Sequence, residues 1–266
     1  MKNNREAVEG RHLSILNMIQ ERGEVKVEEI AESYAVSLMT ARRDLKYLEE
    51  EKLIIRTHGG AISLSKAQMQ LTESERVCLC RDSISEYAAR FIEDGERIFI
   101  NGSCTALNAL KYLEGKKVSV YTNNCHAFNA DFPEGVTIHF TGGEVHGSVM
   151  AGEYVMKNIL AMTADKTFIG CAAVYEDGEF CYDIPTEIGI NEAMIARTVK
   201  EIYVLADHTK IKKRESKTSA YGSCSYAGNC TLVTDSNANP VILDQIRKSG
   251  LKVIVVPARH RQSDEV

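Results

Sequence analysis

The sequence predicts two domains: a small helical domain that ends in a β-hairpin, and a larger α/β domain with a largely parallel sheet. Early in the chain, apolar residues recur at helical spacing, and a glycine pair then separates two apolar runs. Later, short β-rich runs alternate with helical stretches, which is typical of a parallel sheet covered by helices. We therefore place the small domain at residues 1–63, a linker at 64–76 and the α/β domain at 77–266.

The composition is that of a soluble protein with enough apolar residues for a sizeable core. The chain has 266 residues, a formal charge of −5 and 44% hydrophobic residues. No apolar run reaches the roughly 18 residues that a membrane span requires, and the N-terminus lacks the apolar stretch of a secretory signal. The eight cysteines show no paired spacing of the zinc-ligand kind. We expect a cytoplasmic protein with reduced thiols, no metal site and no membrane partner.

Two short helices are predicted at the start of the chain. The stretch GRHLSILNMIQERG presents Leu13, Leu16 and Ile19 at helical spacing, and Gly23 ends the run. The stretch VKVEEIAESY predicts a second helix with a shorter apolar stripe. The residues AVS then form a tight connection to the next helix.

A third helix follows, and Ser37 is placed to cap its N-terminus. On a helical wheel, one arc is apolar and is predicted to pack inward; it comprises Leu38, Ala41, Leu45 and Leu48. The opposite arc is centred on Arg43, with Arg42 to one side, and is completed by Met39, Thr40, Lys46 and Tyr47. The glutamates at positions 49–51 lie at the far end of the helix.

Two helices joined by a three-residue turn, with a basic outer face on the second, are typical of a helix-turn-helix, whose second helix enters the major groove of DNA. Arginine can form two hydrogen bonds with guanine O6 and N7, and hydroxyl groups suit phosphates. The alternative is a solvated helix face. Residues 1–61 carry 10 basic and 11 acidic side chains, so DNA affinity would depend on local placement.

The stretch KLIIRTHGGAISL reads as strand, glycine turn and strand, which would add a wing to the helix-turn-helix. Arg56 and His58 would then lie near backbone phosphates, although an ordinary hairpin is the alternative. The predicted DNA-binding residues are Ser37, Met39, Thr40, Arg42, Arg43, Lys46, Tyr47, Arg56 and His58.

The segment VKVEEIAESYAVSLMTARRDLKYLEEEKLIIRTHGGA resembles the N-terminal signature of the DeoR family of bacterial transcriptional regulators. The family pattern runs roughly as V-S-x-x-T-I-R-R-D-L, then L, then R-x-H-G-G-A. This chain departs from it at Ala41, where isoleucine is common, and at Lys52, where glycine commonly ends the helix. The resemblance implies DNA binding by the third helix, and a left-handed backbone conformation at Lys52.

In the α/β domain the predicted strands are RIFING, KVSVYTN, VTIHFTGG, KTFIGCAAV, EIYVLAD, CTLVTD and LKVIVV. Helical stretches lie between most of them: SISEYAARFI, TALNALKYL, GEYVMKNILAM and EIGINEAMIARTV. In parallel sheets of this kind, ligands bind beyond the carboxyl ends of the strands. Four strand ends carry small or polar residues that suit a phosphate or a sugar hydroxyl: Gly102, Ser103, Cys104, Thr105, Thr122, Asn123, Gly142, Gly143, Asp207 and Lys210.

Each of these strand ends also has an ordinary structural interpretation. A glycine pair often forms a turn, a Thr-Asn pair often caps a helix, and a lone lysine is often solvated. The basic run KIKKRESK can be read as a solvated loop apart from Lys210. Cys104 can be read as a small polar substitute or as a reactive thiol at a helix start.

The same stretches resemble the C-terminal sensor domain of the DeoR family, which is similar to ribose-5-phosphate isomerases. The family pattern contains a D-x-G-T-T-type loop, T-N, G-G, D-K-x-F-I-G and L-A-D-x-S-K; here these read NGSCTA, TN, GG, DKTFIG and LADHTK. The match adds Asn101 and Lys166 to the predicted effector-binding residues. The resemblance implies a phosphorylated sugar as effector and no cofactor. The first loop departs most, at Asn101, Ser103 and Cys104.

These observations favour a transcriptional regulator, most simply a repressor of carbohydrate-metabolism genes that a sugar phosphate releases from its operator. At least a dimer is expected, because paired half-sites are how one helix per subunit gains affinity; dimer and tetramer both remain open. One alternative is a sugar-phosphate isomerase with a DNA-binding appendage, in which Asp207 is the base and Lys210 its partner. Another is a DNA-binding protein whose α/β domain only oligomerises.

Overall fold

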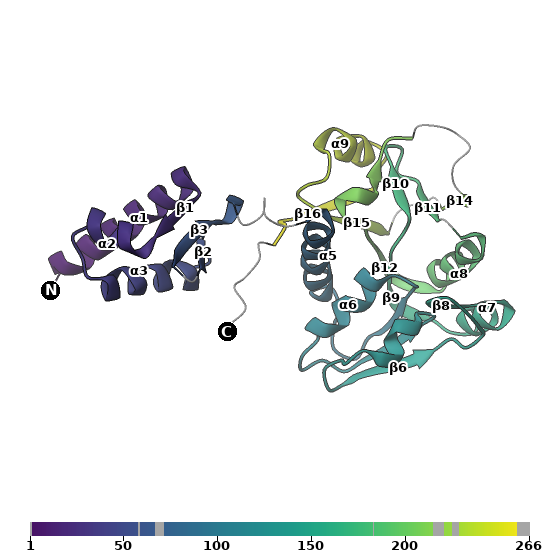
Figure 1. Cartoon of the computed structure of the whole chain (residues 1–266). Coiled ribbons are helices and arrows are strands. Elements are labelled where there is room, and N and C mark those ends of the chain that lie inside the picture. The colour runs from purple at the N-terminus through teal and green to yellow at the C-terminus, as the bar shows by residue number, and fades with distance from the viewer. Residues whose placement is uncertain are drawn as a thin grey trace. The chain divides into compact units, whose positions relative to one another are not determined.

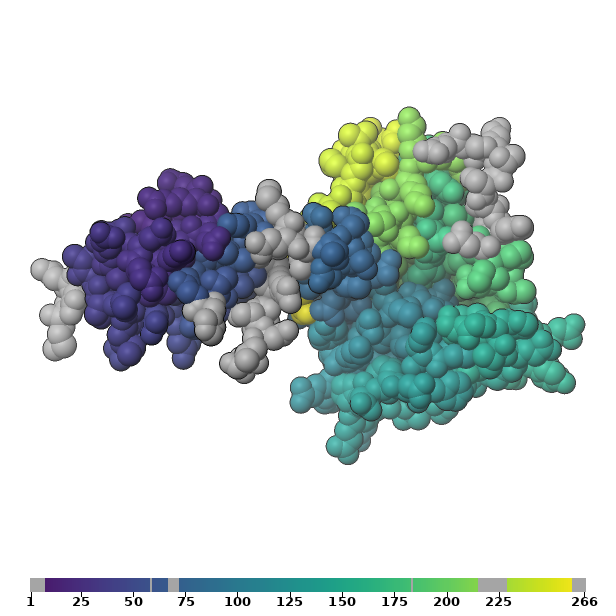
Figure 2. Space-filling view, in the orientation of Figure 1, coloured from purple at the N-terminus to yellow at the C-terminus, as the bar shows by residue number. Residues whose placement is uncertain are grey.

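The computed structural model describes residues 2–57, 59–66, 72–182, 184–214, 221–224 and 229–259. The described chain divides into two compact units, one ending at Leu79 and one spanning Cys80–Arg259 (Figure 1; Figure 2). We call them the N-terminal unit and the α/β unit. In the described part of the chain, no helix combines the length and apolar character needed to span a membrane.

The N-terminal unit packs three helices against a small antiparallel sheet with strand order β1-β3-β2. The helices are α1 (Lys2–Arg22), α2 (Val27–Ser33) and α3 (Leu38–Glu50). The strands are β1 (Glu24–Lys26), β2 (Ile54–Thr57) and β3 (Gly60–Ser63). The predicted hairpin is confirmed, since β2 and β3 pair in antiparallel register from Ile54 opposite Ser63 to Thr57 opposite Gly60.

The core of the N-terminal unit corrects one predicted packing position and shows which apolar residues of α1 are buried. The side chains of Ala41, Leu45 and Leu48 are buried as predicted, but Leu38, the first residue of α3, is 45% exposed. Leu13 is 61% exposed, and the buried stripe of α1 instead contains Ile15 and Ile19. Leu13 lies two positions from Ile15, which places the two side chains on opposite sides of a helix.

Val25 and Lys26, predicted as the start of the second helix, instead belong to β1 and pair with β3. This pairing explains the second glycine of the turn, because a Cβ atom on Gly60 would lie 2.1 Å from the Val25 carbonyl oxygen. The predicted left-handed conformation of Lys52 is confirmed, with a φ of 59° just after α3 ends.

The α/β unit is built on a seven-stranded sheet in which every pairing is parallel. The strand order is β16-β15-β12-β9-β4-β5-β6. The strands are β4 (Arg97–Ile100), β5 (Val118–Thr122), β6 (Val136–Phe140), β9 (Ala164–Ile169), β12 (Thr198–Leu205), β15 (Cys230–Asp235) and β16 (Lys252–Val256). Each of the seven predicted runs contributes one strand, so the predicted parallel sheet is confirmed.

Helices cover both faces of this sheet (Figure 1). They are α5 (Glu73–Ala89), which starts inside the predicted linker, α6 (Cys104–Asn108), α7 (Glu153–Leu160), α8 (Pro185–Ala196) and α9 (Pro240–Lys248), which was not predicted. Successive side chains of β4 point to opposite faces of the sheet. Ile98 and Ile100 pack with α5 and α6 on one face, whereas Phe99 packs with α7 and α8 on the other.

Two small sheets extend the α/β unit beyond the prediction. The run KTFIGCAAV is not one strand, because β9 ends at Ile169 and the chain then enters a four-stranded sheet of order β13-β10-β11-β14. Its strands are β10 (Ala173–Tyr175), β11 (Phe180–Tyr182), β13 (Ile211–Lys212) and β14 (Tyr221–Cys224). A second pair consists of β7 (Glu144–His146) and β8 (Val149–Ala151).

The strand order reverses between β4 and β9. After β4 the chain proceeds outward through β5 and β6, and it then returns to build β9, β12, β15 and β16 on the other side of β4. At such a point the loops after two adjacent strands diverge to opposite faces and leave a crevice at the carboxyl edge. The fold therefore offers a ligand site between the loops that follow β4 and β9.

Candidate functional site

The predicted cap of α3 is present. The Ser37 Oγ atom accepts a hydrogen bond from the Thr40 backbone N–H at 3.1 Å and lies 2.9 Å from the Thr40 Oγ1 atom. The two hydroxyl groups are thus tied together at the N-terminus of α3, where unpaired backbone N–H groups and the helix dipole favour an anion.

The outer face of α3 exposes the predicted basic side chains. Arg42, Arg43 and Lys46 are exposed, and Met39 is 60% exposed. Tyr47 is also exposed, but its ring stacks on His12 of α1 with 4.3 Å between centroids. The Tyr47 ring therefore packs against α1, whereas the side chains of Arg42 and Arg43 are exposed.

Asp44 fixes α3 to α1, a role that sequence reasoning missed. Its buried carboxylate accepts hydrogen bonds from Arg11 at 2.7 and 2.9 Å, and its Oδ1 atom lies 2.9 Å from the His12 Nε2 atom. Burial raises the pKa of Asp44, but the hydrogen bonds from Arg11 and His12 outweigh burial and lower that pKa below its usual value. The sequence gave no sign that the Asp44 side chain is buried, because Asp44 lies among basic residues that are exposed.

The wing is tied to the end of α3 through Glu49. Its carboxylate accepts the Arg56 backbone N–H at 3.2 Å and lies 3.3 Å from the Arg56 Nη1 atom. Arg56, predicted as a phosphate contact, is therefore positioned by an acidic residue of α3. His58 lies outside the described residues.

A cavity of about 340 Å³ lies at the reversal of strand order in the α/β unit. It brings together seven of the predicted effector residues: Asn101, Gly102, Ser103, Cys104, Thr105, Asp207 and Lys210. It also contains residues that sequence reasoning missed: Arg81, Gly170, Cys171, Ala172, Tyr182, Ile184, Glu187 and Leu205. Gly170 to Ala172 directly follow β9, so their position at a strand end was the one available signal.

Asn101 joins the two loops that line this cavity. Its Oδ1 atom accepts the backbone N–H of Ser103 at 3.1 Å and of Gly170 at 3.0 Å. Its Nδ2 atom donates to the Gly170 carbonyl and to the Asn191 Oδ1 atom, both at 3.0 Å. A Cβ atom on Gly170 would lie 2.5 Å from the Ser103 Oγ atom, so only glycine lets the loops approach this closely.

Asp207 and Arg81 form an ion pair at the cavity, with 2.7 Å between the Oδ2 and Nε atoms. The Asp207 Oδ1 atom accepts the Thr209 backbone N–H at 3.0 Å and also the Thr209 hydroxyl. Burial raises the pKa of Asp207, but the bonds from Thr209 and Arg81 outweigh burial and lower it below its usual value. Asp207 is therefore a stable anion, and Arg81 and Lys210 are the cations of the cavity.

The other predicted effector residues lie elsewhere in the described part of the α/β unit. Thr122 and Asn123 are buried, and the Asn123 Nδ2 atom donates to the Met150 carbonyl at 3.1 Å. Gly142 and Gly143 form the turn after β6, where a Cβ atom on Gly143 would lie 2.5 Å from the Ala151 carbonyl oxygen. These two strand ends contact β8 and do not line the cavity.

Lys166 lies near the start of β9, at the end of the sheet opposite the cavity. Its Nζ atom donates to the Phe91 carbonyl at 2.6 Å and lies 3.0 Å from the Glu96 Oε1 atom, and both Lys166 and Glu96 are buried. The Lys166 ammonium group is therefore paired with Glu96 inside the α/β unit. We remove Lys166 from the candidate effector residues.

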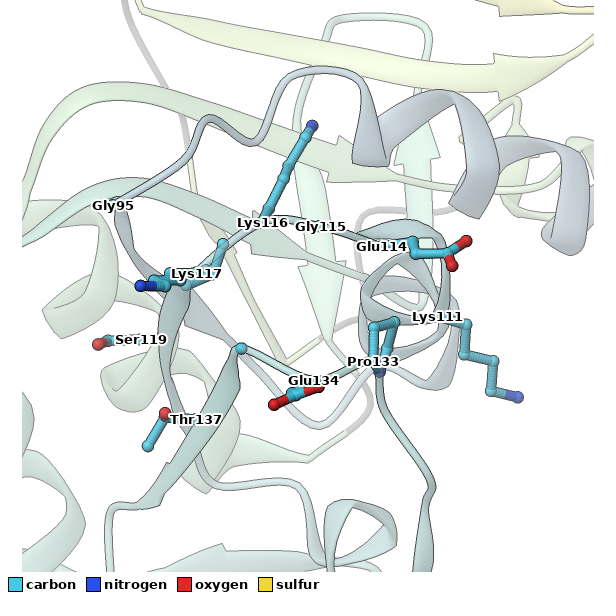
Figure 3. A pocket seen from close by; sticks show the side chains of 12 residues that line it. Gly95, Lys111, Glu114, Gly115, Lys116, Lys117, Ser119, Pro133, Glu134 and Thr137 are labelled. Carbon is cyan, nitrogen blue, oxygen red and sulfur yellow. The ribbon is translucent and has the colours of Figure 1, made fainter.

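A larger hollow of about 1020 Å³ lies at the amino ends of β5 and β6 (Figure 3). Its polar side chains diverge: the Lys116 amine donates to the Ile92 carbonyl at 2.6 Å, while Lys111 and Glu114 point outward. Volume alone does not make a site, and ligands of doubly wound sheets bind at the opposite edge. The smaller cavity is therefore the candidate ligand site.

The thiols near the cavity differ in exposure. Cys104 is exposed at its rim, whereas burial, with a contribution from Asp235, raises the pKa of the Cys80 thiol to about 12. Burial also raises the pKa of Cys171. Without a bound cation to replace the proton, these raised pKa values favour the thiol form of Cys80 and Cys171, which is a poor nucleophile.

Solved structures show a weak likeness to part of this chain. Ribose 5-phosphate isomerase A from Neisseria gonorrhoeae is 16% identical with a TM-score of 0.37, over 55% of this chain and 57% of that one. No functional argument rests on a likeness of this size.

Named relatives match over most of their length. The HTH-type transcriptional repressor GlcR of Bacillus subtilis is 29% identical over 254 residues, which is 93% of this chain and 96% of the relative. The lactose phosphotransferase system repressor of Lactococcus lactis is 29% identical over 241 residues, which is 87% of this chain and 92% of the relative.

Two family models match the two units. The DeoR-like helix-turn-helix domain matches residues 11–67, which contain α3 and the wing, and the DeoR C terminal sensor domain matches residues 80–236, which contain the cavity at the strand reversal. The second match alone covers more than half of the chain. The chain therefore belongs to the DeoR family of transcriptional regulators.

Proposed function

We propose that this regulator is a cytoplasmic repressor of carbohydrate-metabolism genes that a phosphorylated sugar releases from its operator. In this assignment residues 1–63 bind DNA, residues 64–76 are a linker, and residues 77–266 sense the effector and oligomerise. The relatives named as repressors of the lactose phosphotransferase system and of the glycerol-3-phosphate regulon support the link to sugar metabolism.

The exposed face of α3 is the proposed DNA-reading surface. Arg43 and Thr40 face the bases, while Ser37, Arg42 and Lys46 contact phosphates. The Asp44 contacts with Arg11 and His12 support this role, because they fix α3 through a buried side chain and leave the arginines exposed. A side chain that reads a base edge gains most when the helix beneath it is already fixed.

The cavity beside β4 and β9 is the proposed effector site. The positively charged side chains that line this cavity are the main support for the proposal. Arg81 and Lys210 supply positive charge for a phosphate, and Ser103 and Thr105 supply hydroxyl groups for a sugar. Asn101 holds the loop that carries these hydroxyl groups in place. Asp207, the base of the alternative isomerase, already accepts bonds from Arg81 and Thr209 at its two oxygens. Its lowered pKa makes it a weak base, so the site favours binding over proton abstraction.

Release from DNA requires that the effector bind one arrangement of the oligomer more tightly than another, since equal affinity shifts no equilibrium. We propose at least a dimer, because a two-fold pair of α3 helices must match two half-sites on the duplex.

The test is binding of the full-length protein to the DNA just upstream of its own gene, with and without a pool of sugar phosphates. We expect selective binding that the pool weakens, and subdivision of the pool then identifies the effector. Selective binding that ignores every phosphorylated sugar would refute the sensing assignment. Turnover of ribose 5-phosphate that disappears in Asp207→Asn would favour the isomerase.

A further inference from the structure

Three potential metal ligands from distant parts of the chain converge at the carboxyl edge of the sheet. Cys80 lies on α5, His208 follows β12, and Asp235 is the last residue of β15. The ligand atoms of these three side chains all lie within 4.8 Å of one another. The His208 Nδ1 atom is 3.0 Å from the Asp235 Oδ1 atom.

The chemistry of this set fits a divalent transition-metal ion. Thiolate, imidazole and carboxylate are the ligand types that Zn²⁺ takes, at about 2.0–2.3 Å from the ion. Ligand atoms around a tetrahedral ion are then roughly 3.5 Å apart, which small side-chain adjustments of this cluster can reach. Three protein ligands leave one coordination position for water or another donor.

The surrounding groups hold two of the three side chains in place. The Asn237 Nδ2 atom donates to the Cys80 Sγ atom at 3.3 Å. Backbone N–H groups of His208 and Asn237 donate to the two Asp235 oxygens at 2.7 and 3.0 Å. Outer contacts of this kind orient metal ligands and add to metal affinity. Both Cys80 and Asp235 are buried, so an ion there would be shielded from solvent.

We propose that Cys80, His208 and Asp235 bind one divalent transition-metal ion of the Zn²⁺ type. Binding forms a metal–sulfur bond, and the thiol proton leaves to solvent. This site is distinct from the effector cavity but adjoins it in sequence, since Cys80 precedes Arg81 and His208 follows Asp207. A bound ion would thus fasten α5 to the ends of β12 and β15 beside the Arg81–Asp207 pair.

The test is a titration of the reduced, metal-free, full-length protein with Co²⁺, which gives a thiolate-to-metal charge-transfer band when a cysteine is a ligand. We expect a band that saturates at one ion per chain and that Zn²⁺ abolishes by competition. Cys80→Ser should lose the band. Cys78→Ser is the matched control, because Cys78 is exposed on the same helix, and it should keep the band.

A second variant keeps the test decisive if Cys80→Ser does not fold. His208→Gln should retain the thiolate band but weaken Co²⁺ affinity at least about tenfold. Zn²⁺ should also raise the melting temperature of the wild type, and less so that of His208→Gln. Absence of a band in the wild type, or an equal band in Cys80→Ser, would overturn the proposal and leave a hydrogen-bonded cluster. DNA and sugar phosphates are absent from this test, so its result is independent of the proposed effector.

Discussion

The proposed DNA-reading face of α3 and the cavity of the α/β unit present polar groups in opposite ways. On α3 the arginines are exposed and come from one helical turn, and the scaffold beneath them is fixed by buried contacts such as Asp44 with Arg11. In the cavity the polar groups come from α5, the β4 and β9 loops and the end of β12, and they bond to one another.

This difference predicts how each region responds to substitution. Exposed side chains on a rigid helix can be removed with little effect on folding, because surface changes usually alter stability by less than about 0.5 kcal/mol. Buried, mutually bonded groups contribute to stability and to binding together, since removing one partner leaves another unsatisfied. The following experiments test that contrast, from the largest effect to the smallest.

The largest effect is expected in the scaffold beneath α3. Gly60→Ala would place a Cβ atom 2.1 Å from the Val25 carbonyl oxygen, so β1 and β3 must separate. We expect the free energy of unfolding of the N-terminal unit to fall by about 3 kcal/mol, measured by denaturant titration. Gly59→Ala is the matched control and should change stability little, because among the described residues no atom beyond its chain neighbours lies within 4 Å of the added Cβ. Equal losses for both glycines would contradict the role of β1.

On the exposed face, Arg43→Ala should reduce affinity for the operator by about 2 kcal/mol, roughly 30-fold, because a bidentate base contact is lost. Binding to random DNA should change much less, and the melting temperature should stay at the wild-type value. Arg42→Ala should weaken binding to all sequences alike. Competition titrations with operator and random DNA measure both ratios, and identical profiles for the two variants would break the proposed division of roles.

In the cavity, Lys210→Ala should weaken the response to a phosphorylated sugar roughly tenfold, because one charge-assisted hydrogen bond to the phosphate is lost. Operator affinity without effector should be unchanged. Lys212→Ala, an exposed lysine two residues further along, should respond as the wild type does. The measurement is the effector concentration that releases half of the DNA. A wild-type response from Lys210→Ala would place the phosphate elsewhere.

The smallest effect concerns the pH dependence of the Arg81–Asp207 pair. Because the pKa of Asp207 is lowered below 3.8 in the folded protein, the carboxylate stabilises the fold above that pH and loses its contribution as the pH falls below it. The stability advantage of the wild type over Asp207→Asn should therefore shrink as the pH is lowered through and below 3.8. Denaturant titrations at several pH values test this; a constant difference would exclude an ionised, paired Asp207.

The successful sequence predictions concern local patterns. The cap at Ser37, the left-handed Lys52, the hairpin and the strands of the parallel sheet follow from residues close together in the chain. The failures also have a common cause. Leu13 fits a helical stripe as well as Ile15 does, and only the packing of α1 shows which of them is buried.

The proposed effector cavity shows the same limit. The strand ends at Asn101 and Asp207 were predicted to meet and do, but the strand end at Thr122 is buried and Lys166 lies at the opposite edge. A family pattern identifies a residue without stating whether it binds a ligand or supports the fold. Arg81 could not be foreseen, because its partner Asp207 lies 126 positions away in the sequence.

By itself, the sequence determined the strands of the parallel sheet and the basic face of α3, because helix and strand periodicity are properties of neighbouring residues. Only the tertiary structure decided which strand ends share a cavity and that Cys80, His208 and Asp235 meet. Cysteine spacing predicted no metal site, and no spacing rule can detect ligands on three separate segments. Strand order brings these residues together, and strand order depends on packing across the whole sheet.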